Sequence, residues 1–266
     1  MYPITKLTAL FRRYIIISLR AESEFRADFL TSVIQLVLNS VLVIVFWDAI
    51  FRITGPVNGW TFADSVMMAG VGELSWVVAM LFPGMDVLPD RIIKGDFDRY
   101  LTKPAPVLLS FAWERLSIPR VFHSLVAGLC VLGLAVFQFD FQATGMGIAL
   151  GLVLMTLGRV SLVLLNTSVS LVGFWAGKMQ TVQSVLGEFS RFARYPVVFF
   201  GSPMRLLLTW VWPYGLYLTY PVLLARGELE LSRNLLTGAG LLLAGWWLVV
   251  LLLFRAGLRR YESFEG

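Results

Sequence analysis

Five ionisable residues interrupt stretches of the sequence that are otherwise long and apolar. Glu73 and Arg159 each lie near the middle of such a stretch, and Glu188, Arg191 and Arg194 follow one another at intervals of three. An ionisable side chain at the centre of a membrane-spanning helix costs about 2.5–3.5 kcal/mol, so it usually faces a cavity, a partner or a substrate. In a helix, the spacing of three keeps the last three residues on one face. We therefore predict that these five residues line a translocation pathway.

Structural pairing is the alternative for the same residues. Glu73 and Arg159 could neutralise each other inside one subunit, and Glu188 could pair with Arg191 along its own helix. In a third arrangement, Arg191 and Arg194 lie at the cytoplasmic interface and extend toward lipid phosphates. Only a pathway residue would contact a transported molecule.

Residues that could catalyse a reaction are few. Ser161, Ser168 and Ser170 share one apolar stretch and His123 lies in another, but no spacing indicates that a nucleophile meets a base. Serines in membrane helices usually bond to backbone carbonyls of their own helix. The string GFWAGKM at residues 173–179 has the wrong glycine spacing for a phosphate-binding loop, and a methionine follows its lysine. We therefore predict that the chain is not an enzyme.

One cysteine and one histidine limit the metal and redox chemistry of the chain. A lone Cys130 excludes an internal disulfide and any CxxC motif. A lone His123 excludes a multi-histidine metal cluster. The sequence therefore predicts no metal site.

A short charged segment separates two apolar stretches. The string KGDFDRYLTKP, residues 94–104, carries five charged side chains. Gly95 permits a bend within it, and Pro104 ends the helical turn that follows. Apolar residues recur along one side of these turns: Ile92, Ile93, Phe97, Tyr100 and Leu101. A charged helix with an apolar ridge is suited to a groove on a soluble partner, whereas a plain solvated loop is the alternative.

The elements that position these residues must cross a membrane. The chain is 58% hydrophobic and 15% charged, against about 45–50% apolar and about 25% charged in soluble proteins. A spanning helix needs about 20 apolar residues. Six stretches meet this requirement, at residues 29–51, 62–83, 117–138, 146–175, 180–202 and 235–256. We predict one all-α integral membrane domain over residues 1–266, with six transmembrane helices.

Three further segments complete the predicted domain. Residues 1–28 have the pattern of an amphipathic helix lying on the membrane surface. Residues 84–119 form a cytoplasmic region, and residues 203–227 form two short re-entrant or outer-leaflet helices kinked at Pro213 and Pro221. Gly147 and Gly151 are spaced for close helix packing.

The basic residues indicate the orientation. A net charge of +5 could indicate nucleic acid, but basic residues in a membrane protein more often mark the cytoplasmic side. With both termini inside, most of the 22 basic residues fall in cytoplasmic segments and only Arg52, Arg226 and Arg233 fall outside. This distribution predicts cytoplasmic termini, no nucleic-acid partner, and a bacterial or archaeal cytoplasmic membrane.

The charged segment also resembles a known family. Residues 94–104 are similar to the loop after the second helix of type-2 ABC exporter permeases, in particular their six-helix subfamily. The matching residues are Gly95, Phe97, Asp98, Leu101, Lys103 and Pro104. The string FARYP at 192–196 and the positions of Pro213, Pro221 and Gly227 resemble the stretch before that subfamily's last helix.

This resemblance implies the transmembrane subunit of an ATP-driven exporter of hydrophobic or amphipathic molecules. It implies a second permease, identical or related, and two separate ATPase subunits that bind ATP and Mg. The charged segment would be the coupling helix in a groove of the ATPase. Its residues would be Asp90, Arg91, Lys94, Gly95, Asp96, Phe97, Asp98, Arg99, Leu101, Lys103 and Pro104.

Two other classes of function remain open at the level of sequence. An ion-coupled secondary transporter needs no ATPase, but matching broken helices in two halves are absent, since only the second half is broken by proline. A membrane scaffold that transports nothing would tolerate loss of Glu188 and Arg191 but not of the docking residues.

Overall fold

The computed structural model describes residues 4–22, 26–88, 91, 100, 106–176, 180–228, 230 and 232–260. These residues form helices and connecting turns, and no β-strand occurs among them. The all-α class predicted from the sequence is therefore confirmed for this part of the chain.

Five helices of the described chain are long and apolar enough to cross a membrane. They are α2 (Arg26–Thr54), α3 (Phe62–Ala79), α7 (Ile118–Phe137), α8 (Gly145–Leu171) and α13 (Ser232–Arg260). Five of the six predicted spans are thus present as single helices, with boundaries within a few residues of the prediction.

The predicted span at 180–202 differs from the other five. Its helical part, α10 (Gln180–Phe189), has ten residues and continues only as a 3₁₀ turn, η2 (Ser190–Arg194). Pro196 lacks an amide hydrogen and pushes Tyr195 into an extended conformation, with ψ of 138°. A short 3₁₀ turn, η3 (Val197–Phe199), follows. A continuous spanning helix is absent here, so the count of six helices is not confirmed.

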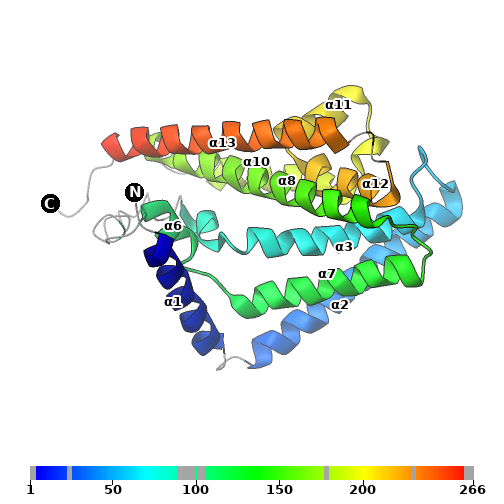
Figure 1. The fold of residues 1–266 in the computed structure, drawn as a ribbon, viewed down its shortest axis with the longest axis horizontal. Coiled ribbons are helices and arrows are strands. Elements are labelled where there is room, and N and C mark those ends of the chain that lie inside the picture. The colour runs from blue at the N-terminus through cyan, green and yellow to red at the C-terminus, as the bar shows by residue number, and fades with distance from the viewer. Residues whose placement is uncertain are drawn as a thin grey trace.

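The long helices lie side by side, and α1 (Ile4–Glu22) runs across one end of them (Figure 1). The start of α1 and the end of α13 lie at this same end, which we call the basic end (Figure 1). Helix α3 packs on α7, and α8 packs on α13. Glycines allow the first of these contacts, because a Cβ on Gly70 would lie 2.7 Å from Leu132, and one on Gly128 would lie 2.7 Å from Leu74.

Close packing also joins α8 to α12 (Tyr220–Arg226), as the spacing of Gly147 and Gly151 predicted. A Cβ on Gly147 would lie 1.9 Å from the carbonyl oxygen of Leu224, and one on Gly151 would lie 2.8 Å from that of Pro221. Only glycine allows the two backbones to approach this closely.

The proline-containing region forms two helical arms. One arm is α11 (Ser202–Leu206) with the π-helical η4 (Leu207–Val211), and the other is the π-helical η5 (Gly215–Thr219) with α12. Pro213 lies in the break between the arms, and Pro221 lies in the first turn of α12. Asn58 donates a hydrogen bond to the Val198 carbonyl (3.1 Å), and Arg226 donates one to the Gly59 carbonyl (2.9 Å). The two arms therefore begin and end near the same turn, between α2 and α3.

Helix α1 is present, as its amphipathic pattern predicted, and it packs on the connection before α7. The Tyr14 hydroxyl donates to the Ser110 carbonyl (3.2 Å), and the amide of Ile118 donates to the Ser18 hydroxyl (2.8 Å). The rings of Phe11 and Trp113 lie 5.0 Å apart. Short elements of this connection are η1 (Pro83–Val87) and α6 (Val107–Ala112).

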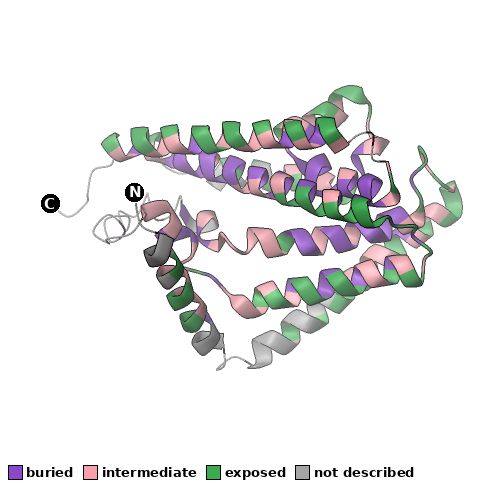
Figure 2. Cartoon of the chain, viewed as in Figure 1, coloured by how far each residue is buried: buried purple, intermediate pink, exposed green. Residues whose placement is uncertain are grey.

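Buried residues concentrate in α3, α8 and the two arms (Figure 2). Helix α2 is different, because only 6% of its apolar window is buried inside the chain. Its exposed apolar side chains include Val37, Val41, Leu42 and Val45. Lipid or another subunit must cover this face in a membrane.

Candidate functional site

A cavity of about 1200 Å³ lies between α2, α3, α8 and η5. Its wall also includes Gly187, Ser190 and Arg194 from the segment after α9 (Gly173–Ala176). Along α3 and its C-cap residue it extends from Ser65 to Met80, which at about 1.5 Å per residue is about 22 Å. The cavity therefore runs along most of the length of the helical bundle.

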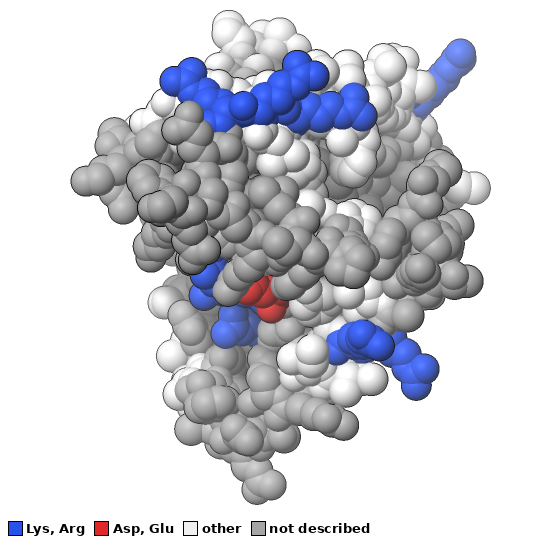
Figure 3. All heavy atoms as spheres, turned by 90° about the vertical axis from the view of Figure 1, so that its left-hand side faces the viewer, with Lys and Arg blue, Asp and Glu red and all other residues white. Residues whose placement is uncertain are grey.

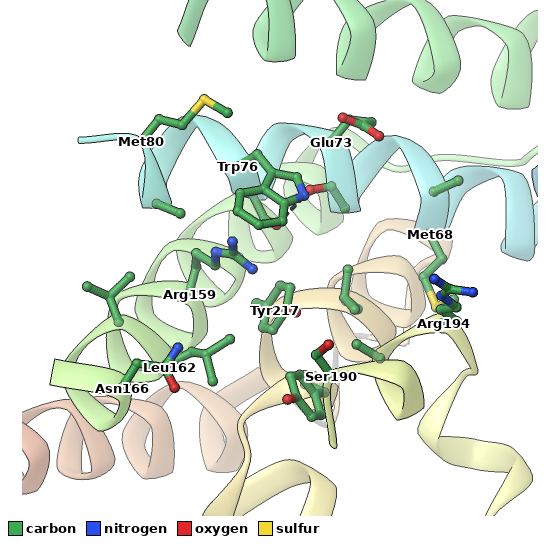
Figure 4. Close-up of a pocket in the computed structure, with 18 of the residues that line it drawn as sticks. Met68, Glu73, Trp76, Met80, Arg159, Leu162, Asn166, Ser190, Arg194 and Tyr217 are labelled. Atoms are coloured by element: carbon green, nitrogen blue, oxygen red, sulfur yellow. Dashed lines mark hydrogen bonds between the residues drawn. The ribbon is translucent and has the colours of Figure 1, made fainter. Parts of the chain in front are cut away.

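Arg159 is the most deeply buried charged group of this cavity, with 6% of the residue exposed. Its guanidinium carbon lies 4.3 Å from the centre of the Trp76 ring and 5.1 Å from that of Tyr217. Figure 4 shows the guanidinium extending from α8 toward these two rings. Both distances allow a cation–π interaction, which orients the cation without neutralising it.

The backbone beside Arg159 explains why Tyr217 is so close. A Cβ on Gly158 would lie 2.8 Å from the Leu216 Cβ and 2.9 Å from the Tyr217 amide nitrogen. The missing side chain lets η5 rest directly on α8. The next residue along α8 then faces the ring of Tyr217.

Glu73 also lines the cavity but does not pair with Arg159. Among the described residues, neither side chain forms an ion pair. In Figure 4 the Glu73 carboxylate points away from Arg159 and Tyr217. The structure therefore brings both predicted residues to one cavity without the pairing considered as the alternative.

The predicted stripe of three residues is divided by the structure. Arg194 lines the cavity, whereas Glu188 and Arg191 are not among its lining residues. Glu188 and Arg191 form an ion pair of 3.0 Å with each other, and their side chains are 63% and 69% exposed. The stripe crosses an element boundary, because Glu188 lies in α10 whereas Arg191 and Arg194 lie in η2.

Several lining residues were missed by the sequence analysis. Trp76 and Tyr217 hold Arg159, and Asn166 lies on α8 two turns after it. Asn166 follows the predicted residue Arg159 by seven positions, and Trp76 follows Glu73 by three. These helical spacings were a usable signal in the sequence. No local pattern links Tyr217 to α8, because η5 follows α8 only after more than forty residues.

An aromatic cluster closes α2 against the segment after η2. The ring of Trp47, a residue only 3% exposed, lies 6.2 Å from Tyr195 and 6.1 Å from Phe199. The Phe46 ring lies 6.4 Å from Tyr195. Phe46, Trp47 and Tyr195 also line the cavity. They form one of its walls.

Most of the predicted coupling segment lies outside the described residues. Of the eleven residues predicted to contact an ATPase, only Arg91 is described, and it is half-buried. Tyr100, within the same segment, is fully buried. Its hydroxyl donates a hydrogen bond to the Glu114 carboxylate, and its ring lies 5.1 Å from that of Phe111. Tyr100 itself is therefore packed into the helical domain.

The basic end carries exposed arginines, and Figure 3 views the molecule from this side. The described ones are Arg12, Arg13, Arg115, Arg120, Arg255, Arg259 and Arg260. Arg115 and Arg120 also line the cavity. The cavity therefore reaches the end of the molecule at which basic side chains gather.

Residues 37–264 match the family described as ABC-2 family transporter protein. No curated protein and no solved structure was found to match the chain.

Proposed function

The chain belongs to the ABC-2 family of transporter proteins and is a membrane permease of an ABC transporter, and from this premise we propose that it serves an exporter. Its substrate is a hydrophobic or amphipathic molecule, and separate ATPase subunits supply the energy. ATP and Mg are bound by those subunits. The observation that carries the proposal is the cavity, which is long, lined by both apolar and charged side chains, and continuous with the basic end.

Six crossings of the membrane are proposed, with the fifth made by several short elements. Helix α8 ends at the basic end, and α13 begins at the opposite end (Figure 1). The chain between them must therefore cross the bundle once. Ten residues of α10 at about 1.5 Å and five of η2 at about 2 Å span about 25 Å, close to the ~30 Å of a hydrocarbon core. The two arms that follow would then be re-entrant.

The basic end is proposed to face the cytoplasm. The described arginines at this end agree with the preference of basic residues for the cytoplasmic side. This orientation gives both termini a cytoplasmic location, as expected in a bacterial or archaeal cytoplasmic membrane. It also presents the segment at residues 90–104 to a soluble ATPase.

A second permease, identical or related, is proposed to cover the apolar face of α2. This face is too apolar and too little buried to be explained by contacts inside one chain. Two ATPase subunits would then bind one coupling segment each. Movement of that segment would reach the cavity through Tyr100 and the start of α7.

Affinity purification from the native membrane tests the proposal. The full chain is isolated in mild detergent beside a Phe97→Ala, Leu101→Ala double variant and an Arg259→Gln control at the same end. We expect a P-loop ATPase with the wild type and the control, and its loss from a folded double variant. Absence of any ATPase from the wild type would favour ion-coupled transport instead.

The orientation has its own test. With Cys130 replaced by serine, a single cysteine at Gln142 or at Arg259 is exposed to a thiol reagent that does not cross membranes. We expect labelling of Gln142→Cys in intact cells and of Arg259→Cys only after lysis. The reverse result would contradict the proposed orientation.

A further inference from the structure

Arg159 is a buried cation for which the described chain provides no counter-ion. Its Nε is buried without a hydrogen-bond partner. No carboxylate of the described residues lies within ion-pair distance of its guanidinium. An arginine inside a membrane protein normally pairs with an acid or with backbone carbonyls, or marks the path of a substrate. A ligand with a negative charge would supply the missing partner.

We propose that the cavity binds the anionic head group of an amphipathic substrate and that Arg159 is the residue that binds it. The inference rests on the proposed transport function and adds the charge class of the substrate. Suitable head groups are phosphate esters and carboxylates. The planar guanidinium can donate two parallel hydrogen bonds to either of them.

The two aromatic rings prepare Arg159 for this role. Trp76 and Tyr217 hold the guanidinium in place, with their ring centres at 4.3 and 5.1 Å from its carbon atom. The Nε donor has no partner among the described residues and remains available to a ligand. A positioned cation binds an anion with less loss of side-chain freedom than a mobile one.

Taken together, the charged residues around the cavity favour the binding of an anion. Its lining includes four arginines, at 115, 120, 159 and 194, and one acid, Glu73. Glu73 points away from the guanidinium of Arg159 (Figure 4). Arg115 and Arg120 lie at the basic end and would raise the local concentration of anions at the entrance to the cavity.

The remaining wall of the cavity is suited to the apolar tail of the proposed substrate. Leu42, Val43 and Phe46 line the cavity from α2, and Leu162 and Val163 line it from α8. Apolar side chains on both sides would contact hydrocarbon, not a hydrated ion. A ligand with a charged head and an apolar tail matches both parts of the lining.

Lipid binding by the purified full chain tests the proposal. In a neutral detergent, the chain is titrated with phosphatidylglycerol or with phosphatidylcholine of the same acyl chains, and bound lipid is counted by native mass spectrometry. We expect the wild type to prefer the anionic lipid about tenfold, the scale of one charge-assisted contact. Arg159→Gln should abolish the preference, whereas Arg259→Gln, an exposed arginine at the basic end, should retain it.

Three results would overturn the proposal. They are a wild type without the preference, a folded Arg159→Gln variant that keeps it, and equal competition by glycerol 3-phosphate, which would indicate a site for free anions. If Arg159→Gln does not fold, Trp76→Leu takes its place, because Trp76 is 49% exposed and its loss should weaken the preference several-fold. Unchanged preference in that variant also counts against the proposal. Lipid binding requires no ATPase, so its failure is distinguishable from failure of ATPase co-purification.

Discussion

Arg226 donates a hydrogen bond of 3.0 Å to the carboxylate of Asp64 and thereby joins the end of α12 to the start of α3. The Asp64 side chain is 2% exposed, whereas that of Arg226 is 30% exposed. The same carboxylate accepts hydrogen bonds from the amide and the hydroxyl of Thr61, at 2.7 and 2.8 Å. One buried acid therefore caps α3 and joins α12 to it at the end of the bundle opposite the basic end.

Asp64→Asn should destabilise the protein because it leaves Arg226 without this charge and weakens the cap of α3. Breaking a fully buried pair costs about 3–5 kcal/mol, and the partial exposure of Arg226 reduces this to about 2 kcal/mol. The measurement is thermal unfolding of the purified protein in detergent. Asp48→Asn is the matched control, since the pair of Asp48 and Arg52 is exposed to solvent and should contribute little to stability. Equal effects of the two variants would contradict this account.

Gly158→Ala should move η5 away from α8. The added methyl group would lie within 3 Å of Leu216 and Tyr217, and backbone atoms cannot yield as a flexible side chain does. We expect a loss of about 1–3 kcal/mol in stability and weaker binding of anionic lipid, because Tyr217 would leave Arg159. Gly240→Ala on α13 is the control, since its methyl group meets nothing within 4 Å. That variant should be unchanged or more stable by up to about 1 kcal/mol.

Tyr100→Ala should loosen the proposed coupling segment. The ring is fully buried beside Phe111, and removing a buried aromatic ring costs about 3–5 kcal/mol. Tyr100→Phe keeps the ring and removes the hydrogen bond to Glu114, which should cost about 1 kcal/mol. We expect the yield of co-purified ATPase to fall in the alanine variant and to persist in the phenylalanine variant. An undiminished yield with Tyr100→Ala would show that this anchor is not needed for docking.

Arg194→Gln should impair transport more than Arg191→Gln does. Arg194 lines the cavity, whereas Arg191 is exposed and paired with Glu188. Reconstituted vesicles with the partner ATPase measure uptake or release of a fluorescent anionic lipid. Stability of both variants should change by less than about 1 kcal/mol, because the side chains are exposed. A larger defect with Arg191→Gln would restore the stripe of three residues as a unit of the pathway.

Features set by local composition could be predicted from the sequence. Five spans, the amphipathic α1 and the break at Pro213 depend on the hydropathy, period and backbone limits of consecutive residues. The predicted span at 180–202 was not found as one helix because its hydropathy says nothing of the turn geometry before Pro196. A ten-residue helix followed by 3₁₀ turns can have the same overall hydropathy as one spanning helix.

The candidate site was only partly predictable. The cost of an ionisable group in an apolar stretch singled out Glu73, Arg159 and Arg194 by their residue types alone. Their neighbours could not be inferred in this way. Tyr217 reaches Arg159 because Gly158 lets a π-helical segment rest on α8, and Arg226 reaches Asp64 because α12 ends beside the turn before α3. The sequence by itself determined which residues are costly to bury, since that cost is a property of each side chain. Only the tertiary structure decided which of them are paired and which face a cavity, because pairing depends on distances between segments far apart in the chain.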